Sequence, residues 1–413
     1  MSRAVPEIPG HMAPPHVASA LQHQVSRLLG RRSTAFPGSQ PVSFARKHIE
    51  NNLFKEDYFV CEKSDGIRCL MYLASENGEE AVYLITRNNE YYLIPQLHFP
   101  TERGPSTFHE GGLIDGELVI SRSKDGSEKL KYLMFDCLAL EGKLLTNRSL
   151  DKRLGHLRTF LYKPYEQLWH EFPEDCKLFP FRAEFKQMSR ASYLTQVFEE
   201  ILPRLGHVSD GLIFTPRYTP YVFGTDEKLL KWKPPEENTV DFKLQLEFPT
   251  FTDPDLPPET ATYPVYDDKP VFHLLVWHGG TKHVDFSTMY VTDEEWEKLK
   301  GLNEPLNGRI VESFKDDDHQ WRYMRFRDDK ETGNHISTVE KVIESIEDSV
   351  SKEELIKSHK MIWEYWKQRE KAGQQGSSMD RRQSHSEESH GGHKRPLSMV
   401  QGNGEKRLKS DED

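Results

Sequence analysis

The sequence predicts an α+β protein with two domains, a larger one of mostly antiparallel strands and a smaller five-stranded barrel. Short β-rich runs separated by turn residues recur between residues 57 and 140, and two helical segments follow them. Five further strand-like runs lie between residues 240 and 326, beyond the break at Pro234 and Pro235. A chain of 413 residues is long enough for two such domains with tails.

The larger domain is expected to span residues 36–236. Its strands are runs of aliphatic, aromatic and β-branched residues between turn clusters. They fall at 58–61, 67–73, 82–86, 113–120 and 131–138, with further strands at 208–215 and 228–232. Helices are expected at 150–162 and 189–205.

The second domain is expected to span residues 237–336. Its runs, at 240–246, 271–277, 283–291, 310–314 and 321–326, fit a small barrel of the oligonucleotide-binding type. The insert 251–269 is rich in proline and aspartate, so we expect a long loop there.

Residues 1–35 are expected to form an amino-terminal extension. Within it, residues 16–32 form a mildly basic amphipathic stretch that suits a surface helix, although a mitochondrial presequence has a similar pattern.

Helices are expected over 337–371. Ser337 with Glu340 and Ser351 with Glu354 are spaced as capping boxes that open such helices. The segment 372–413 has few apolar residues and is expected to be disordered.

Two basic clusters within this tail suit recognition by a nuclear import receptor. One is Lys394 with Arg395, and the other lies at 406–409. A solvated charged tail is the alternative interpretation.

Composition limits the classes of function. The net charge of -11 argues against a protein that coats nucleic acid through its overall charge. Four cysteines, none in a Cys-x-x-Cys pair, suggest reduced core thiols rather than disulfides or a zinc site. No apolar run approaches the roughly 18 residues of a membrane span, so a soluble nuclear protein is expected.

Lys63 is the leading candidate for a catalytic residue. It lies between two apolar strand-like runs, with Asp65 and Gly66 forming a tight turn and Arg68 five residues on. An amine held at such a point suits a covalent nucleophile, provided that it loses its proton. Nearby positive charge favours the neutral amine. Lys231 and Lys233 share one strand face. There we expect them to supply that charge and to hold phosphate oxygens. An exposed strand face is the ordinary explanation for such a lysine pair.

Carboxylates accompany the predicted strands. Asp115 and Glu117 share one face of a strand whose other face is apolar, which suits binding of ribose hydroxyls or a cation. Asp210 begins another apolar strand, where a hard metal ion is readily held. A turn aspartate is the ordinary alternative for each.

Taken in order, these motifs resemble those of the covalent nucleotidyltransferases, which include mRNA capping guanylyltransferases and nucleotide-dependent polynucleotide ligases. The matching segments are KSDGIR at 63–68, DGE at 115–117, FD at 135–136, DGLIF at 210–214, LKWK at 230–233 and RFRDDK at 325–330. The segment 321–330, with Asn334 behind it, resembles the capping-enzyme form, as does FPGSQPVS at 36–43. The resemblance therefore implies a nucleotidyltransferase domain followed by an OB-fold domain and a helical extension.

The resemblance also implies roles for individual residues. Lys63 is implied to form a lysyl-N-GMP intermediate, and Asp210 to coordinate a divalent metal, Mg or Mn. Nucleotide contacts are implied for Arg68, Arg87, Glu117, Phe135, Lys186, Lys231, Lys233 and Asp241. Contacts to the pyrophosphate leaving group are implied for Arg327, Asp329 and Lys330.

The implied reaction transfers GMP from GTP to the 5'-diphosphate end of pre-mRNA. An ATP-dependent ligase shares the lysine chemistry and is the second hypothesis, and a non-catalytic single-strand binder is the third. The resemblance further implies a separate RNA 5'-triphosphatase subunit and binding to the phosphorylated tail of RNA polymerase II. A basic and aromatic patch is the candidate for the tail contact, with a solvated helix face as the alternative. Its residues are Lys152, Arg153, Arg158, Tyr162, Lys163 and Tyr165.

Overall fold

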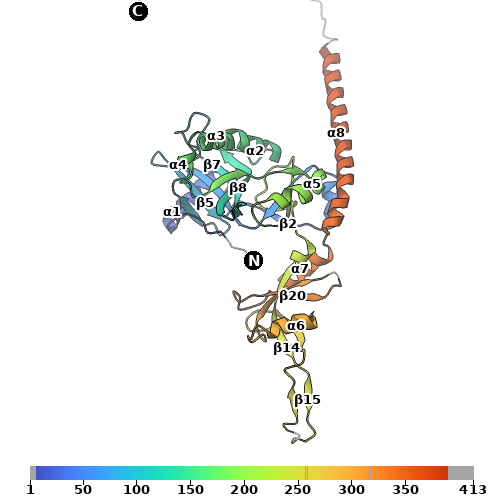
Figure 1. Cartoon of the computed structure of the whole chain (residues 1–413). Helices are drawn as coiled ribbons and strands as arrows, with labels where there is room; N and C mark the ends of the chain where they lie inside the picture. The colour runs from blue at the N-terminus through green and yellow to red at the C-terminus, as the bar shows by residue number, and fades with distance from the viewer. Residues whose placement is uncertain (1–5, 256, 258, 317, 389–413) are drawn as a thin grey trace, which may run out of the picture. The chain divides into compact units, whose positions relative to one another are not determined.

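The computed structural model describes residues 6–255, 257, 259–316 and 318–388. The chain up to Trp363 forms one compact unit, and Figure 1 shows its elements. Two sheets and a closed barrel carry most of the strands. The predicted α+β class is confirmed.

The larger sheet has eight strands and forms one wall of the first domain. In order across the sheet they are β1 (His11–Met12), β6 (Tyr91–Ile94), β5 (Glu79–Thr86), β4 (Ile67–Glu76), β7 (Gly112–Arg122), β8 (Glu128–Leu140) and β10 (Arg182–Phe185), with β9 (Lys143–Leu144) beside β8. All pairs are antiparallel except β8 with β10. The long runs of β4 and β7 are buried, as expected for strands covered on both faces.

The second sheet has five strands and carries Lys63. Its order is β11 (Ser189–Arg190), β3 (Tyr58–Ser64), β12 (Ser209–Pro216), β13 (Gly224–Trp232) and β2 (Ser39–Ser43). Lys63 lies near the end of β3, one residue before the turn that leads into β4. A Cβ on Gly66 in this turn would lie 2.3 Å from the Leu118 carbonyl oxygen, so only glycine lets the turn approach β7 this closely.

Helices pack on these sheets. The first-domain helices are α1 (Pro15–Leu28), α2 (Leu150–Leu157), α3 (Lys163–Glu171), α4 (Pro173–Cys176) and α5 (Leu194–Gln196). The buried face of α1, with Leu21 and Val25, belongs to the same core as Leu70 of β4. The predicted surface helix is therefore present, and its apolar face is part of the domain core.

The barrel has the five strands that the sequence predicts. They are β14 (Thr239–Glu247), β17 (Val271–Trp277), β18 (His283–Tyr290), β20 (Trp321–Phe326) and β19 (Ile310–Lys315), in the order in which they close. The remaining helices are α6 (Asp293–Lys300), α7 (Ile336–Glu347) and α8 (Lys352–Glu388). Helix α6 was not expected from the sequence, although Thr292 and Glu295 form a full capping box at its start.

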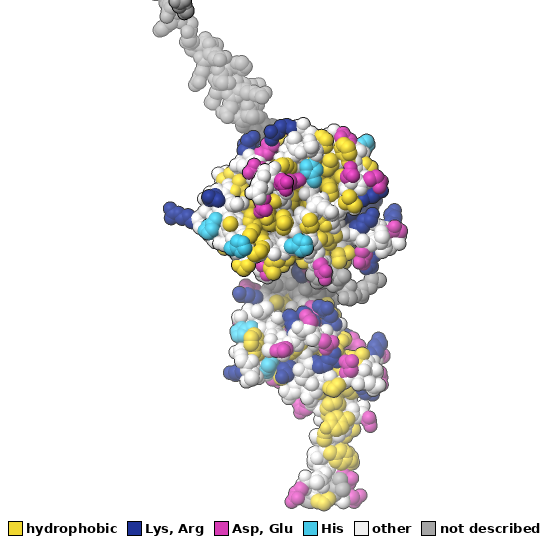
Figure 2. All heavy atoms as spheres, turned by 90° about the vertical axis from the view of Figure 1, so that its left-hand side faces the viewer, with side chains coloured by type: hydrophobic (Ala, Val, Ile, Leu, Met, Phe, Trp, Pro, Cys, Tyr) yellow, Lys and Arg dark blue, Asp and Glu magenta, His cyan; other side chains and the backbone are white. Residues whose placement is uncertain are grey.

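Several local predictions are wrong. The insert 251–269 is not a structureless loop, because β15 (Thr250–Thr252) and β16 (Thr262–Pro264) pair as a hairpin. The rings of Phe251 and Tyr263 lie 5.9 Å apart across it, and Figure 2 shows hydrophobic side chains exposed along the hairpin. Cross-strand aromatic pairing of this kind stabilises short strands.

The helix predictions also need correction. The segment 189–205 is a short strand followed by helical turns rather than one helix. His335, not Ser337, caps α7 through its side chain. Ser351 and Glu354 do form the predicted capping box.

The carboxy-terminal end differs from the expectation in its described part. Helix α8 continues to Glu388, whereas the sequence analysis ends the helices near residue 371. The basic clusters at 394–395 and 406–409 lie outside the described residues.

The predicted core thiols are confirmed: Cys61, Cys69, Cys137 and Cys176 are all free and buried. In the described part of the chain, no helix has both the length and the apolar character for a membrane crossing.

Candidate active site

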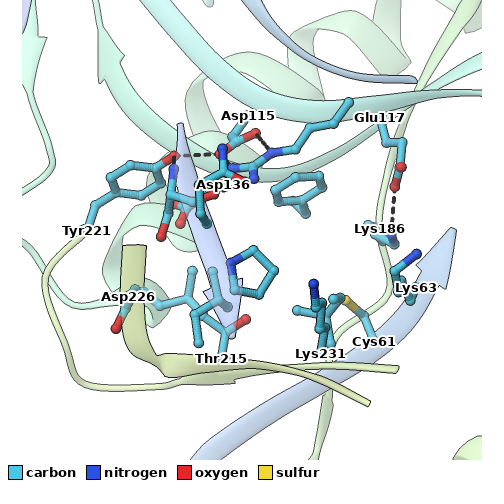
Figure 3. A pocket seen from close by; sticks show the side chains of 18 of the residues that line it. Cys61, Lys63, Asp115, Glu117, Asp136, Lys186, Thr215, Tyr221, Asp226 and Lys231 are labelled. Carbon is cyan, nitrogen blue, oxygen red and sulfur yellow. Dashed lines mark hydrogen bonds and ion pairs between the residues drawn. The ribbon is translucent and has the colours of Figure 1, made fainter. Parts of the chain in front are cut away.

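A cavity of about 370 Å³ lies between the two sheets of the first domain. Figure 3 shows side chains from both sheets pointing into it. Eight residues that the sequence analysis selected line this cavity. They are Lys63, Arg68, Arg87, Glu117, Phe135, Lys186, Lys231 and Lys233.

Lys63 is held by Asp210. The Lys63 Nζ lies 2.7 Å from Asp210 Oδ1, and Lys233 Nζ lies 2.8 Å from Asp210 Oδ2. Burial alone would raise the pKa of Asp210, but the hydrogen bonds from Lys233 and Lys63 outweigh it and lower that pKa. One ionised carboxylate therefore positions two amines.

The backbone beside Asp210 explains the glycine that follows it. Gly211 has a φ of +151°, and a Cβ there would lie 2.0 Å from the Trp232 carbonyl oxygen. This close approach brings β12 against β13, which carries Lys231 and leads to Lys233. In the DGLIF motif, Asp210 therefore contacts the two lysines, and Gly211 allows β12 and β13 to pack closely.

Positive charge gathers at this end of the cavity. Burial lowers the pKa of Lys231, and the charges of Lys233, Lys63 and Arg87 lower it further. Burial and the neighbouring Arg68 also lower the pKa of Arg87. Cations that repel one another in a partly closed cavity are a site for an anion such as a polyphosphate.

Lys186 lies at another wall, among polar groups. Its Nζ donates to Ser64 Oγ over 2.6 Å and lies 3.7 Å from Glu62 and 3.8 Å from Glu117. Burial raises the pKa of Glu117, although the neighbouring charges, that of Lys186 above all, act to lower it. Lys186 and Glu117 were expected at the site from the sequence, whereas the contacts of Lys186 with Ser64 and Glu62 were not.

Phe135 lies within reach of two cations. Its ring centroid is 5.6 Å from the Arg68 guanidinium carbon and 5.5 Å from Lys186 Nζ. Arg68 also forms a two-pronged ion pair with Asp115, at 3.0 Å and 2.7 Å. An aromatic face flanked by fixed donors suits the stacking and orientation of a base.

The predicted basic and aromatic patch is only partly present. Arg153 is buried and donates to both oxygens of Asp136, at 2.7 Å and 2.8 Å, so it belongs to the core. Tyr165 is buried as well. Lys152, Arg158 and Lys163 are exposed and Tyr162 is half-buried.

Four of the selected residues lie on the barrel and do not line the cavity. Asp241 of β14 accepts from Arg327 at 3.2 Å and from the Lys330 ammonium group. Arg327 also donates to both oxygens of Asp329. The structure therefore brings Asp241, Arg327, Asp329 and Lys330 together as a cluster of their own.

Family models cover both domains of the chain. The model described as "mRNA capping enzyme, catalytic domain" matches residues 4–235, and "mRNA capping enzyme, C-terminal domain" matches residues 237–356. The two matched segments meet between residues 235 and 237.

Curated proteins from fungi are similar over most of their length. The mRNA-capping enzyme subunit alpha of Yarrowia lipolytica is 50% identical, with 89% of this chain and 93% of that protein covered. The subunit alpha of Schizosaccharomyces pombe is 44% identical, with 88% and 90% covered. That of Saccharomyces cerevisiae is 45% identical, with 86% and 85% covered.

Solved structures of DNA ligases show a more distant similarity. The ligase domain of Mycobacterium tuberculosis LigD is 15% identical over 72% of this chain and 95% of its own, with a TM-score of 0.34. The ATP-dependent ligase of bacteriophage T7 is 17% identical over 70% and 98%, also with a TM-score of 0.34. The two family models and the fungal relatives show that this chain belongs to the mRNA capping enzyme family.

Proposed function

We propose that Lys63 is the residue that carries GMP in the mRNA guanylyltransferase reaction of this enzyme. One observation carries the proposal above all others: Lys63 Nζ lies in the nucleotide-sized cavity, 2.7 Å from a carboxylate that also holds Lys233. A lysine fixed among cations that bind phosphate is arranged for attack on phosphorus.

The first step forms the covalent adduct. The neutral Lys63 Nζ attacks the α-phosphorus of GTP, a P–N bond forms, and the bond to the bridging oxygen of the β-phosphate breaks. Pyrophosphate leaves and the amine proton is released. Lys231 and Lys233 contact the α-phosphate oxygens, and positioning with charge neutralisation is the main source of rate in such transfers.

The base and ribose bind at the other walls of the cavity. Phe135 stacks on guanine and Lys186 donates to its carbonyl. Arg68, Arg87 and Glu117 bind the ribose and the adjoining phosphate. The buried ion pairs of this region hold these groups before substrate arrives, which lowers the entropic cost of orientation.

Asp210 is the candidate ligand of a divalent metal. A single carboxylate completed by substrate phosphates and waters is the usual donor set for Mg²⁺. The described residues contain no group of three or more His, Cys, Asp or Glu side chains that could together hold a metal ion. Within them, protein side chains alone therefore do not complete a metal site. A bound Mg or Mn ion supplies further neutralisation of the phosphate charge.

The barrel cluster is proposed to act on the leaving group. Arg327 and Lys330 orient the pyrophosphate of GTP, with Asp329 holding the Arg327 guanidinium in place. In this structure the Asp241 carboxylate accepts hydrogen bonds from both Arg327 and Lys330. Asp241 thus holds the two side chains next to each other, aligned to contact the phosphate oxygens of GTP.

The second step transfers GMP from Lys63 to the 5'-diphosphate end of pre-mRNA, in the nucleus. A separate RNA 5'-triphosphatase subunit supplies that end, which agrees with the name subunit alpha of the fungal relatives. The exposed side chains of Lys152, Arg158 and Lys163 are the part of the predicted patch left to bind the phosphorylated polymerase tail.

Covalent labelling tests the proposed reaction. The protein is incubated with Mg²⁺ and either GTP or ATP labelled at the α-phosphate, then separated under denaturing conditions. Label from GTP alone supports the proposal, whereas preferential labelling by ATP supports a ligase and no labelled protein contradicts both.

A further inference from the structure

Tyr221 closes a ring of hydrogen bonds beside the nucleotide cavity. Its hydroxyl donates to Asp115 Oδ2 over 2.6 Å and accepts from the Ser39 backbone N–H over 2.8 Å. Arg68 completes the ring, because it donates twice to Asp115 and once to the Ser39 carbonyl oxygen. Figure 3 shows Tyr221 and Asp115 joined beside the cavity.

The ring is shielded from water. Asp115 is fully buried, and the relative exposures of Ser39 and Tyr221 are 4% and 8%. Burial, followed by the nearby Asp115 charge, raises the pKa of Tyr221 well above its usual value. The hydroxyl is therefore protonated at physiological pH and serves as a donor to the carboxylate.

All four residues of the ring line the cavity, and Arg68 is the one whose donors we expect to contact the nucleotide. Three of its five N–H groups are used by Asp115 and Ser39. Within the described part of the chain, the other two remain for substrate oxygens at the cavity wall. Any tilt of the Asp115 carboxylate turns this guanidinium and moves those two donors.

We infer that Tyr221 is a positioning residue for nucleotide binding, which fixes the Arg68 guanidinium through the Asp115 carboxylate. The inference rests on the proposed function, since it concerns how GTP is held before attack by Lys63. Tyr221 does not react. It sets the angle at which Arg68 meets the substrate.

Removal of the hydroxyl alone leaves its loop anchored. The Tyr221 N–H donates to the Thr146 carbonyl oxygen, and Arg153 donates to the Thr219 carbonyl oxygen over 3.0 Å. The Tyr221 ring also packs on Phe223, with centroids 5.8 Å apart. Tyr221→Phe keeps all of these contacts and deletes only the two bonds of the hydroxyl.

The test compares Tyr221→Phe with the wild-type enzyme in single-turnover formation of the labelled GMP adduct. We expect the apparent KM for GTP to rise on the order of tenfold, as for the loss of one hydrogen bond to a charged group, with the maximal rate changed less than about twofold. Tyr218→Phe is the matched control: Tyr218 lies on the same loop with 58% exposure and should match wild type.

A second arm separates positioning from general stability. In an Arg68→Lys background, where no guanidinium remains to be oriented, Tyr221→Phe should change the apparent KM less than about twofold. Asp115→Asn should raise the apparent KM for GTP in the wild-type background but not in the Arg68→Lys background. This variant therefore provides the same test if Tyr221→Phe folds poorly.

An unchanged KM in Tyr221→Phe, or an equal rise with and without Arg68, overturns the inference. A wild-type enzyme that forms no adduct overturns the proposed function instead. A wild-type adduct on Lys63 together with an unchanged Tyr221→Phe variant sinks the inference alone.

Discussion

Asp210 holds Lys63 and Lys233 at once, with its two carboxylate oxygens 2.7 Å and 2.8 Å from their amines. The carboxylate is only 6% exposed, whereas the two lysines are 25% and 31% exposed. A buried carboxylate thus organises two lysine amines at the substrate cavity.

Asp210→Asn should slow adduct formation by about a hundredfold or more, because it removes the charge that aligns both amines and the candidate metal ligand. It should also lower the free energy of unfolding by about 1–2 kcal/mol, since the lysines keep their mutual repulsion. Single-turnover labelling and urea unfolding measure the two effects. A variant with wild-type labelling rate would remove Asp210 from the mechanism.

Lys231 should make GTP binding sensitive to alkaline pH. Its pKa lies below the usual value for lysine, chiefly through burial, so its charge is lost as pH rises at a lower pH than for an exposed lysine. Loss of that charge weakens phosphate binding. In a Lys63→Ala background, which cannot react, the Kd for GTP should therefore increase as pH rises from neutral toward 10.

Lys231→Arg in the same background is the control, because arginine keeps its charge throughout this range. The added substitution should flatten the pH dependence. Identical titration curves for the two proteins, measured by calorimetry or nucleotide fluorescence, would show that another group is responsible.

Arg153→Met should destabilise the protein by about 3–5 kcal/mol. The change leaves the Asp136 carboxylate buried without its two-pronged partner. Lys152→Ala, at the exposed neighbouring position, should change stability by less than about 0.5 kcal/mol. Denaturant unfolding compares them, and equal stabilities would contradict the buried role of Arg153.

Asp241→Asn should affect one step of the reaction and spare the other. Arg327 and Lys330 lose the charge that aligns them, so adduct formation from GTP and its reversal by pyrophosphate should both slow, on the order of tenfold. Transfer of GMP from purified adduct to 5'-diphosphate RNA involves no pyrophosphate and should keep its rate. Equal slowing of transfer would argue for a general folding defect.

Sequence reasoning located the eight lining residues of the cavity that carry its proposed chemistry, because these residues lie in short motifs. Lys63 follows from its place before the turn between β3 and β4, and Glu117 and Lys231 follow from alternation along β7 and β13. The ring around Tyr221 did not follow, because its partners Asp115 and Ser39 are 106 and 182 residues away. No local pattern indicates such contacts.

Arg153 shows a signal that was present and misread. Buried Leu150, Leu154 and Leu157 have helical spacing, and Arg153 falls on the same face of α2. An arginine inside an apolar stripe indicates a buried partner rather than a surface patch. In the insert 251–269, by contrast, apolar and polar residues do not alternate clearly between the prolines. The strands of the hairpin therefore could not be predicted there.

The most direct measurement is the mass of the peptide that carries the adduct. Wild-type protein incubated with GTP and Mg²⁺ is digested under conditions that preserve the P–N bond, and the modified lysine is identified by fragmentation. We expect GMP on Lys63 and no adduct in Lys63→Ala, with Lys231→Ala still modified at Lys63 at a reduced level. GMP on any other lysine, or a full adduct in Lys63→Ala, would contradict it.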